Sequence, residues 1–172
     1  PDAATALARL APEWGGLASQ AAREMARAHV VQAHADALRF PGGVLAQSVA
    51  RHGPDPLALV ALSGEGGAGA LLAAFRRLAT RPHAPEGLVI CDASGTLTLR
   101  KGISGFPLPR FGAACPLWPL FAALSRPGQP IETRVMVAGP TGRPFLLRAL
   151  AEVVVPGGFS GPALVRSAML IA

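Results

Sequence analysis

The hydrophobic pattern of the chain changes its period about halfway along. Up to about residue 80, apolar residues recur with the three- and four-residue spacing of helices. From residue 86 onward, apolar and polar residues alternate, which is typical of strands. The sequence therefore predicts a helical region over residues 1–80 and an α+β region over residues 86–172, joined by the proline-rich segment 81–85.

The first region is expected to hold one long helix and several short ones. Residues 17–38 lack Gly and Pro and are rich in Ala, Arg, Glu, Met and Gln, a composition that favours a long helix. Chain-breaking residues follow, and shorter helices are predicted at residues 44–51, 56–62 and 70–80. Asp55 is a candidate N-cap for the second of these. The last is amphipathic, with Arg76 and Arg77 opposite its apolar face, and should pack against a core.

The second region contains five candidate strands. They are predicted at residues 88–92, 96–101, 131–138, 145–155 and 163–171, with hairpin turns at 93–95 and 139–142. A helix is expected between the second and third strands. This order predicts a five-stranded antiparallel sheet with a helix across one face, a topology similar to the PAS and GAF sensor folds.

The stretch from Phe106 to Gly128 predicts that helix and the loop before it. Cys115 stands at the position of an N-cap and Pro116 at the first helical position, which proline tolerates. The apolar residues that recur at helical spacing are Leu117, Leu120, Phe121 and Leu124. Gly128 then ends the helix.

The same residues carry a family resemblance. Arg-Phe-Gly-x-x-Cys-Pro-Leu-Trp, followed by a helix and Pro-Gly, resembles the C-terminal domain of the short-chain fatty acyl transcriptional regulators, most clearly over residues 87–152. These are bacterial repressors and activators with an amino-terminal XRE-type helix-turn-helix. The resemblance implies a regulatory domain that senses a short-chain acyl-CoA or a related metabolite, in a cytoplasmic homodimer that contacts DNA through a helix-turn-helix domain outside this chain.

The resemblance also bears on the helical region. The central region of the family resembles a degenerate metallopeptidase-like unit, to which residues 1–80 would correspond. No His-Glu-x-x-His signature occurs in the sequence. His29 and His34 lie about 140° apart around the axis of the predicted helix, so they cannot both bind one metal ion. We therefore expect no peptidase activity and no metal site here, and a role in dimerisation instead.

Resemblance and charge placement together suggest a ligand site. The candidate ligand-binding residues are Arg110, Cys115, Trp118, Arg126, Arg134 and Arg148. In the expected topology the four arginines flank one surface of helix and sheet, where their planar guanidinium groups would bind the phosphates of an acyl-CoA. The thiol and the indole would line the pocket for its apolar tail. Solvated arginines, a buried thiol and a core tryptophan remain alternatives for each single residue.

Composition narrows the function classes. The 172 residues are 51% hydrophobic, enough for one full core, and no apolar run approaches the ~18 residues of a membrane span. The formal charge is +6, supplied by arginines and the single Lys101, and these cations are scattered rather than gathered in one stripe. Charge alone therefore does not predict DNA contact. The chain begins with Pro1 and lacks a signal-peptide pattern, so we expect a cytoplasmic fragment of a longer protein.

A dinucleotide-binding enzyme is the main alternative. Gly64-Glu-Gly-Gly-Ala-Gly69 has the G-x-G-x-x-G spacing, precedes a predicted helix and lies 23 residues before Asp92. Against it, residues 57–62 follow Asp55-Pro56 as a helix would, and no later strand–helix–strand units follow. The serines lack a G-x-S-x-G elbow, and Cys91 and Cys115 lack neighbours at metal spacing. The prediction is a non-enzymatic domain without a cofactor.

Overall fold

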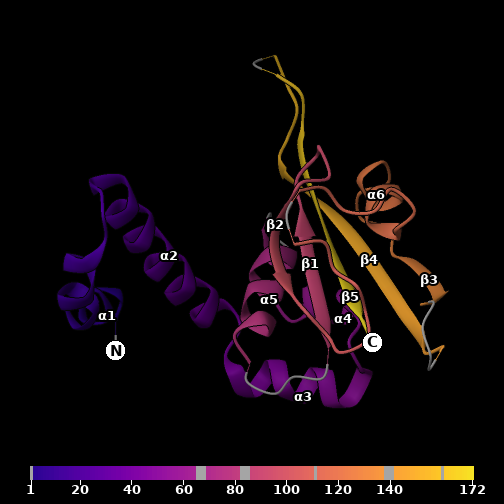
Figure 1. Ribbon diagram of the computed structural model, residues 1–172, viewed down its shortest axis with the longest axis horizontal. Helices are drawn as coiled ribbons and strands as arrows, with labels where there is room; N and C mark the ends of the chain where they lie inside the picture. The colour runs from indigo at the N-terminus through magenta and orange to yellow at the C-terminus, as the bar shows by residue number, and fades with distance from the viewer. Residues whose placement is uncertain (1, 65–68, 82–85, 111, 138–141, 160) are drawn as a thin grey trace.

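The computed structural model describes residues 2–64, 69–81, 86–110, 112–137, 142–159 and 161–172. The helices precede the sheet along the chain, with one short helix inserted among the strands (Figure 1). The elements are α1 (Ala3–Leu10), the 3-10 helix η1 (Ala11–Gly16), α2 (Gln20–Arg39), α3 (Gly42–His52), α4 (Pro56–Ala61), α5 (Ala70–Ala79), β1 (Gly87–Cys91), β2 (Leu97–Lys101), α6 (Pro119–Leu124), β3 (Ile131–Met136), β4 (Pro144–Val155) and β5 (Leu164–Ile171). The predicted α+β class is confirmed.

The strands form one sheet in the order β2-β1-β5-β4-β3, and every pair in it is antiparallel. This confirms the predicted five-stranded antiparallel sheet. The expected division at residues 81–85 lies mostly outside the described residues and stays a prediction, as does the likeness to PAS and GAF folds.

The dinucleotide alternative is wrong at the level of topology. Asp55 caps α4, its side chain accepting a hydrogen bond from the Leu57 N–H at 2.9 Å, so the segment before Gly64 is helical rather than a strand. The described strands form no parallel pair that could place a nucleotide at their carboxyl ends. Residues 65–68 of the glycine motif lie outside the described residues.

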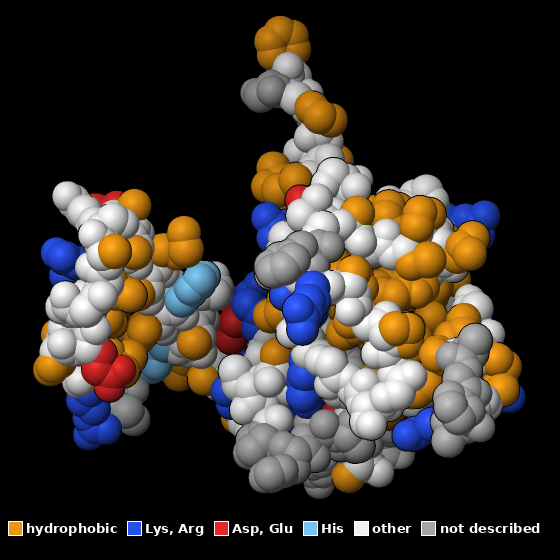
Figure 2. Space-filling view, viewed as in Figure 1, with side chains coloured by type: hydrophobic (Ala, Val, Ile, Leu, Met, Phe, Trp, Pro, Cys, Tyr) orange, Lys and Arg blue, Asp and Glu red, His pale blue; other side chains and the backbone are white. Residues whose placement is uncertain are grey.

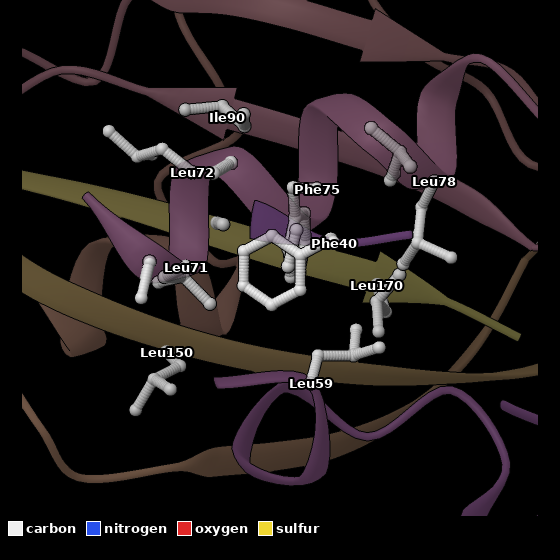
Figure 3. Close-up of a cluster of buried hydrophobic side chains, with 14 of the residues drawn as sticks. Phe40, Leu59, Leu71, Leu72, Phe75, Leu78, Ile90, Leu150 and Leu170 are labelled. Atoms are coloured by element: carbon white, nitrogen blue, oxygen red, sulfur yellow. The ribbon is translucent and has the colours of Figure 1, made fainter. Parts of the chain in front are cut away.

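Alternation along the strands gives the sheet two differently covered faces. The helix-side face packs against α3, α4 and α5, and Figure 3 shows the side chains that meet there. Its largest buried side chains include Phe40, Leu59, Leu71, Phe75, Leu78, Leu88 and Leu170. The α6-side face packs against α6 and the loop before it. Its buried side chains include Phe106, Leu120, Phe145, Leu147, Met169 and Ile171.

The helix on the α6 side begins later than predicted. Trp118 is its N-cap and Pro119 its first residue, so Cys115 and Pro116 lie in the preceding turn. A residue before proline avoids the helical region of backbone space, and Trp118 accordingly has φ −74° and ψ 146°. The helix can therefore start only after it. Leu117, expected on the apolar face, is 89% exposed.

The long helix α2 leaves the body of the molecule. Its amino-terminal part and α1 form a separate lobe beside the sheet domain (Figure 1). Among the side chains of α2, Asp36 alone is buried, whereas seven residues of α5 are. Contact between α2 and the body is therefore confined to its carboxyl-terminal part, next to α5.

Candidate functional site

A cleft lies where α2 meets the body of the molecule. Its volume is about 620 Å³, and it is lined by side chains of α2, α5, β1, β2 and β5. Leu72, Ile90 and Leu99 supply apolar surface, because each lies on the helix-side face of the sheet or on the helix that covers it. We call this space the α2 cleft. Its size falls in the range of about 300–1,000 Å³ found for small-molecule sites.

One ion pair crosses the α2 cleft. The Nε and Nη2 atoms of Arg76 donate to the two carboxylate oxygens of Asp36 at 2.6 and 2.9 Å, and Gln32 donates to the same carboxylate at 2.9 Å. Asp36 is 3% exposed. A second cavity of about 400 Å³ also has Asp36 and Arg76 in its wall. A bidentate, hydrogen-bonded bridge therefore stands between two hollows and ties α2 to α5.

The wall of the α2 cleft carries more positive than negative charge. Arg76, Arg77 and Arg166 face one aspartate, Asp36, so two positive charges remain after the pair is counted. In Figure 2 basic and acidic side chains gather where the lobe joins the body. The buried Nε of Arg166 has no hydrogen-bond partner within the protein. Such an unpartnered buried donor is costly, and its burial keeps it out of reach of groups in the cleft.

The structure separates the arginines that the sequence analysis grouped on one surface. Ile131 pairs with Ala149 on the α6 side, and alternation then turns Arg134 and Arg148 to the helix side. Arg148 donates to Glu132 at 2.7 Å and lies 3.5 Å from the carbonyl oxygen of Pro54, just before α4. The expectation that all four arginines flank one surface with α6 is wrong, because strand pleating turns Arg134 and Arg148 to the opposite face of the sheet.

The remaining predicted residues lie on or near the α6 side. Arg110 is exposed and lines a groove of about 280 Å³ beside β2, and Arg126 is exposed just after α6. Cys115 is a half-buried free thiol. The ring of the half-buried Trp118 packs on Phe106 with 5.6 Å between centroids, against the α6-side core. A ligand role for these residues stays a prediction.

The amino terminus of α5 is already occupied by a carboxylate of the chain. The N–H groups of Leu71 and Leu72 donate to the two oxygens of Glu152 at 3.1 and 3.2 Å. A dinucleotide motif would present these same N–H groups to a pyrophosphate. Because Glu152 holds them, the local geometry also speaks against the dinucleotide hypothesis.

Asp92, the expected ribose partner, serves a turn instead. Its Oδ1 accepts hydrogen bonds from the N–H and the hydroxyl of Ser94 at 2.9 and 2.6 Å and from the N–H of Thr96 at 3.1 Å. The Ser94 hydroxyl is the main reason that the pKa of this carboxyl lies below its ordinary value. The carboxylate therefore stabilises the β1–β2 hairpin.

The thiols, membrane spans and metal sites give little further chemistry. Burial raises the pKa of the Cys91 thiol to about 11, so this cysteine stays protonated at neutral pH. Within the described ranges, no three His, Cys, Asp or Glu side chains gather as metal ligands would. No described helix combines the length and the apolar character needed to cross a bilayer.

Comparison with known proteins decides the family. Residues 79–167, more than half of the chain, match the family described as short-chain fatty acyl coenzyme A regulator, C-terminal. The chain belongs to this family. The resemblance noted over residues 87–152 is thereby confirmed and extends at both ends. A propionyl-CoA carboxylase regulator of Cereibacter sphaeroides is 40% identical over 92 residues, which are 50% of this chain and 19% of that protein.

The fold of this acyl-CoA regulator family member is also found in a solved structure. A Mycobacterium tuberculosis transcriptional regulator matches with a TM-score of 0.66 over 90% of this chain and 46% of its own, at 23% sequence identity. The chain thus spans less than half the length of either relative. The fold match includes most of the helical region, which the family match does not.

Sequence reasoning missed the residues of the α2 cleft. Arg76 and Arg77 were noted only as the polar side of a helix, and Arg166 was not singled out. The available signal in the sequence was Asp36, a carboxylate in a long predicted helix that has few large apolar residues. The structure buries this carboxylate, and a buried carboxylate needs a partner. Its partner is 40 residues away in sequence, and periodicity does not predict such pairs.

Proposed function

We propose that this chain is the effector-binding regulatory domain of a bacterial transcription regulator, and that its effector is a short-chain acyl-CoA or a closely related metabolite. Membership in the acyl-CoA regulator family supports this proposal. The structural observation that carries it is the α2 cleft, which combines an apolar floor with three arginines and one aspartate in its wall. An acyl-CoA has the matching parts, a short apolar chain and several phosphate charges.

The two sides of the α2 cleft would bind different parts of the effector. The short acyl chain would lie against Leu72, Ile90 and Leu99, where binding would remove apolar surface of both partners from water. Arg77 and Arg166 would receive phosphate or carbonyl oxygens, since guanidinium groups bind such oxygens in pairs.

Binding in the α2 cleft would act on α2 itself. This helix of 20 residues is about 30 Å long and touches the body only near its carboxyl end. An effector that contacts both α2 and the sheet favours one position of α2 over others, which is a population shift. The proposal includes a homodimer in which an XRE-type helix-turn-helix domain, outside this chain, reads that position on DNA.

Calorimetry of the chain with propionyl-CoA tests this proposal. Arg166→Gln is expected to weaken binding at least tenfold, and Leu99→Trp, which fills the cleft, is expected to abolish it. Arg110→Gln and Trp118→Leu are matched changes at the α6-side residues predicted from sequence, and they should leave the affinity unchanged. The reverse pattern would move the site to the α6 side. Absence of heat and of any thermal shift at millimolar acyl-CoA would overturn the effector.

A second measurement separates a sensor from an enzyme. After overnight incubation with excess propionyl-CoA, the free thiol content of the solution is expected to stay constant. Release of coenzyme A, detected with a thiol reagent, would show thioester cleavage and contradict a purely regulatory role.

A further inference from the structure

The β4–β5 hairpin extends beyond the sheet as an arm. β3 pairs with β4 only as far as Ala149, and β1 pairs with β5 only from Ser167 onward. Beyond these points the two strands pair with each other, and Gly158 and Gly161 exchange hydrogen bonds near the tip. Residues 153–159 and 161–164, called the arm here, project away from the body in Figure 1.

The arm is apolar and uncharged. Residues 153–165 contain no Asp, Glu, Lys, Arg or His. Its large exposed hydrophobic side chains are Val153, Val155, Phe159 and Leu164, and hydrophobic side chains follow the arm to its tip in Figure 2. Phe159 has no protection from solvent at all. Uncharged strand edges and a bare aromatic side chain favour association, because nothing on them repels a partner.

A groove at the base of the arm offers a complementary surface. It has a volume of about 420 Å³ and is lined by Leu57 and Val60 of α4, Leu71 of α5 and Val153 of the arm. Its single charged lining residue is Glu152, whose oxygens already accept the hydrogen bonds from the start of α5. We call this hollow the arm-base groove. It has room and apolar surface for an aromatic ring.

The geometry points to a second copy of this chain as the partner, and we propose that two copies exchange arms. Phe159 lies six residues beyond Val153, so the tip stands about 20 Å from the base of the arm. When two arms lie antiparallel about a two-fold axis, each tip reaches the base of the other arm. Phe159 of each copy then enters the arm-base groove of its partner, which is a self-complementary interface.

Charge favours this surface over others for self-association. The chain carries a formal charge of +6, so two copies repel each other through most of their surface. The arm and the arm-base groove contain no lysine or arginine, and here two copies meet without that repulsion. The proposal is independent of the effector, because neither the arm nor this groove lies in the α2 cleft.

Sedimentation analysis of the chain tests the exchange. A dimer is expected, and Phe159→Asp should raise its dissociation constant roughly 100-fold, as loss of a buried aromatic anchor does. Leu117→Asp is the matched control, since it adds the same charge at another exposed apolar residue and should leave the dimer intact. A monomeric wild-type chain at high micromolar concentration, or a Phe159→Asp variant that dimerises normally with an unchanged circular dichroism spectrum, would overturn the proposal.

Cross-linking identifies the contact itself. In a Cys115→Ala background, Phe159→Cys combined with Leu57→Cys should give a covalent dimer on mild oxidation. Each single cysteine variant should remain largely monomeric on a non-reducing gel, because the antiparallel arms place identical positions far apart. A covalent dimer formed equally well by Phe159→Cys alone would show that the tips meet each other and contradict insertion into the groove.

Discussion

The two faces of the sheet are covered in different ways. On the α6 side, the cover comes from the segment between β2 and β3, and it meets the sheet through apolar and aromatic side chains such as Phe106 and Leu120. On the helix side, the cover comes from the chain before the sheet, and apolar packing is joined by charged contacts. They include the Asp36–Arg76 pair and the Glu152 cap of α5, and on the same face the Arg148–Glu132 pair joins β4 to β3.

This difference assigns different physical roles to the two faces. Apolar packing is strong, non-directional and lost only when the core opens. A charged contact at a partly exposed position is weaker, because water competes for the same groups. The apolar cores on both faces are therefore expected to set the stability of the domain. The helix side holds α2 by a contact in which charged groups take part.

The largest effect is expected in the α6-side core. Phe145 is 1% exposed, and its ring meets that of Phe106 edge to face at 5.2 Å. Phe145→Ala removes this packing and leaves a cavity, so the free energy of unfolding should fall by about 3–5 kcal/mol. Urea denaturation measures it. Leu117→Ala, on the same side but exposed, should change stability by less than about 0.5 kcal/mol; equal losses in the two variants would contradict the account of this core.

The Asp36–Arg76 bridge should have a smaller and more local effect. Asp36→Asn removes the charge that Arg76 pairs with, and since Arg76 is about one-third exposed we expect a loss of about 1–2 kcal/mol. Hydrogen exchange should become faster in α2 and remain unchanged in β4 and β5. If the strands exchanged faster to the same degree, α2 would be an integral part of the fold and the contrast between the two faces would fail.

The sequence predicted the elements and the antiparallel sheet well, and the contacts between the helices and the sheet poorly. Alternation in residues 131–137 and the Asp55-Pro56 start of α4 are local signals, and both predictions are confirmed. The start of α6 was wrong because Pro116 and Pro119 both satisfy a first helical position. The α2 cleft depends on contacts between residues 40 or more apart, such as Asp36 with Arg76. Such contacts are set by tertiary packing, which single-sequence periodicity does not encode.

Glu152, which caps α5, is expected to contribute more to stability than the exposed Glu132. Glu152→Gln keeps the size of the side chain but removes the charge that two N–H groups share, so stability should fall by about 1 kcal/mol. Glu132→Gln is the matched change at an exposed ion pair with Arg148, and it should cost at most about 0.5 kcal/mol. Thermal unfolding of both variants measures the difference. A larger loss in Glu132→Gln would reverse the ranking of these contacts.

The smallest effect, absent at neutral pH, concerns the thiol in the α6-side core. Burial raises the pKa of Cys91 from its ordinary value of 9.0 to about 11, so the folded protein keeps its proton where the unfolded chain loses it. The unfolded state then binds fewer protons, and stability falls as pH rises. The contribution of the thiol should be complete below pH 9.0 and lost progressively up to about 11. Urea midpoints of the wild type at pH 8.5 and 10.5 should therefore differ more than those of Cys91→Ala.

A thiol reagent at pH 8 should modify Cys115, which is half-buried, well before Cys91. Equal rates at the two cysteines would show that water enters this core, and the α6-side face would then be no tighter than the helix side.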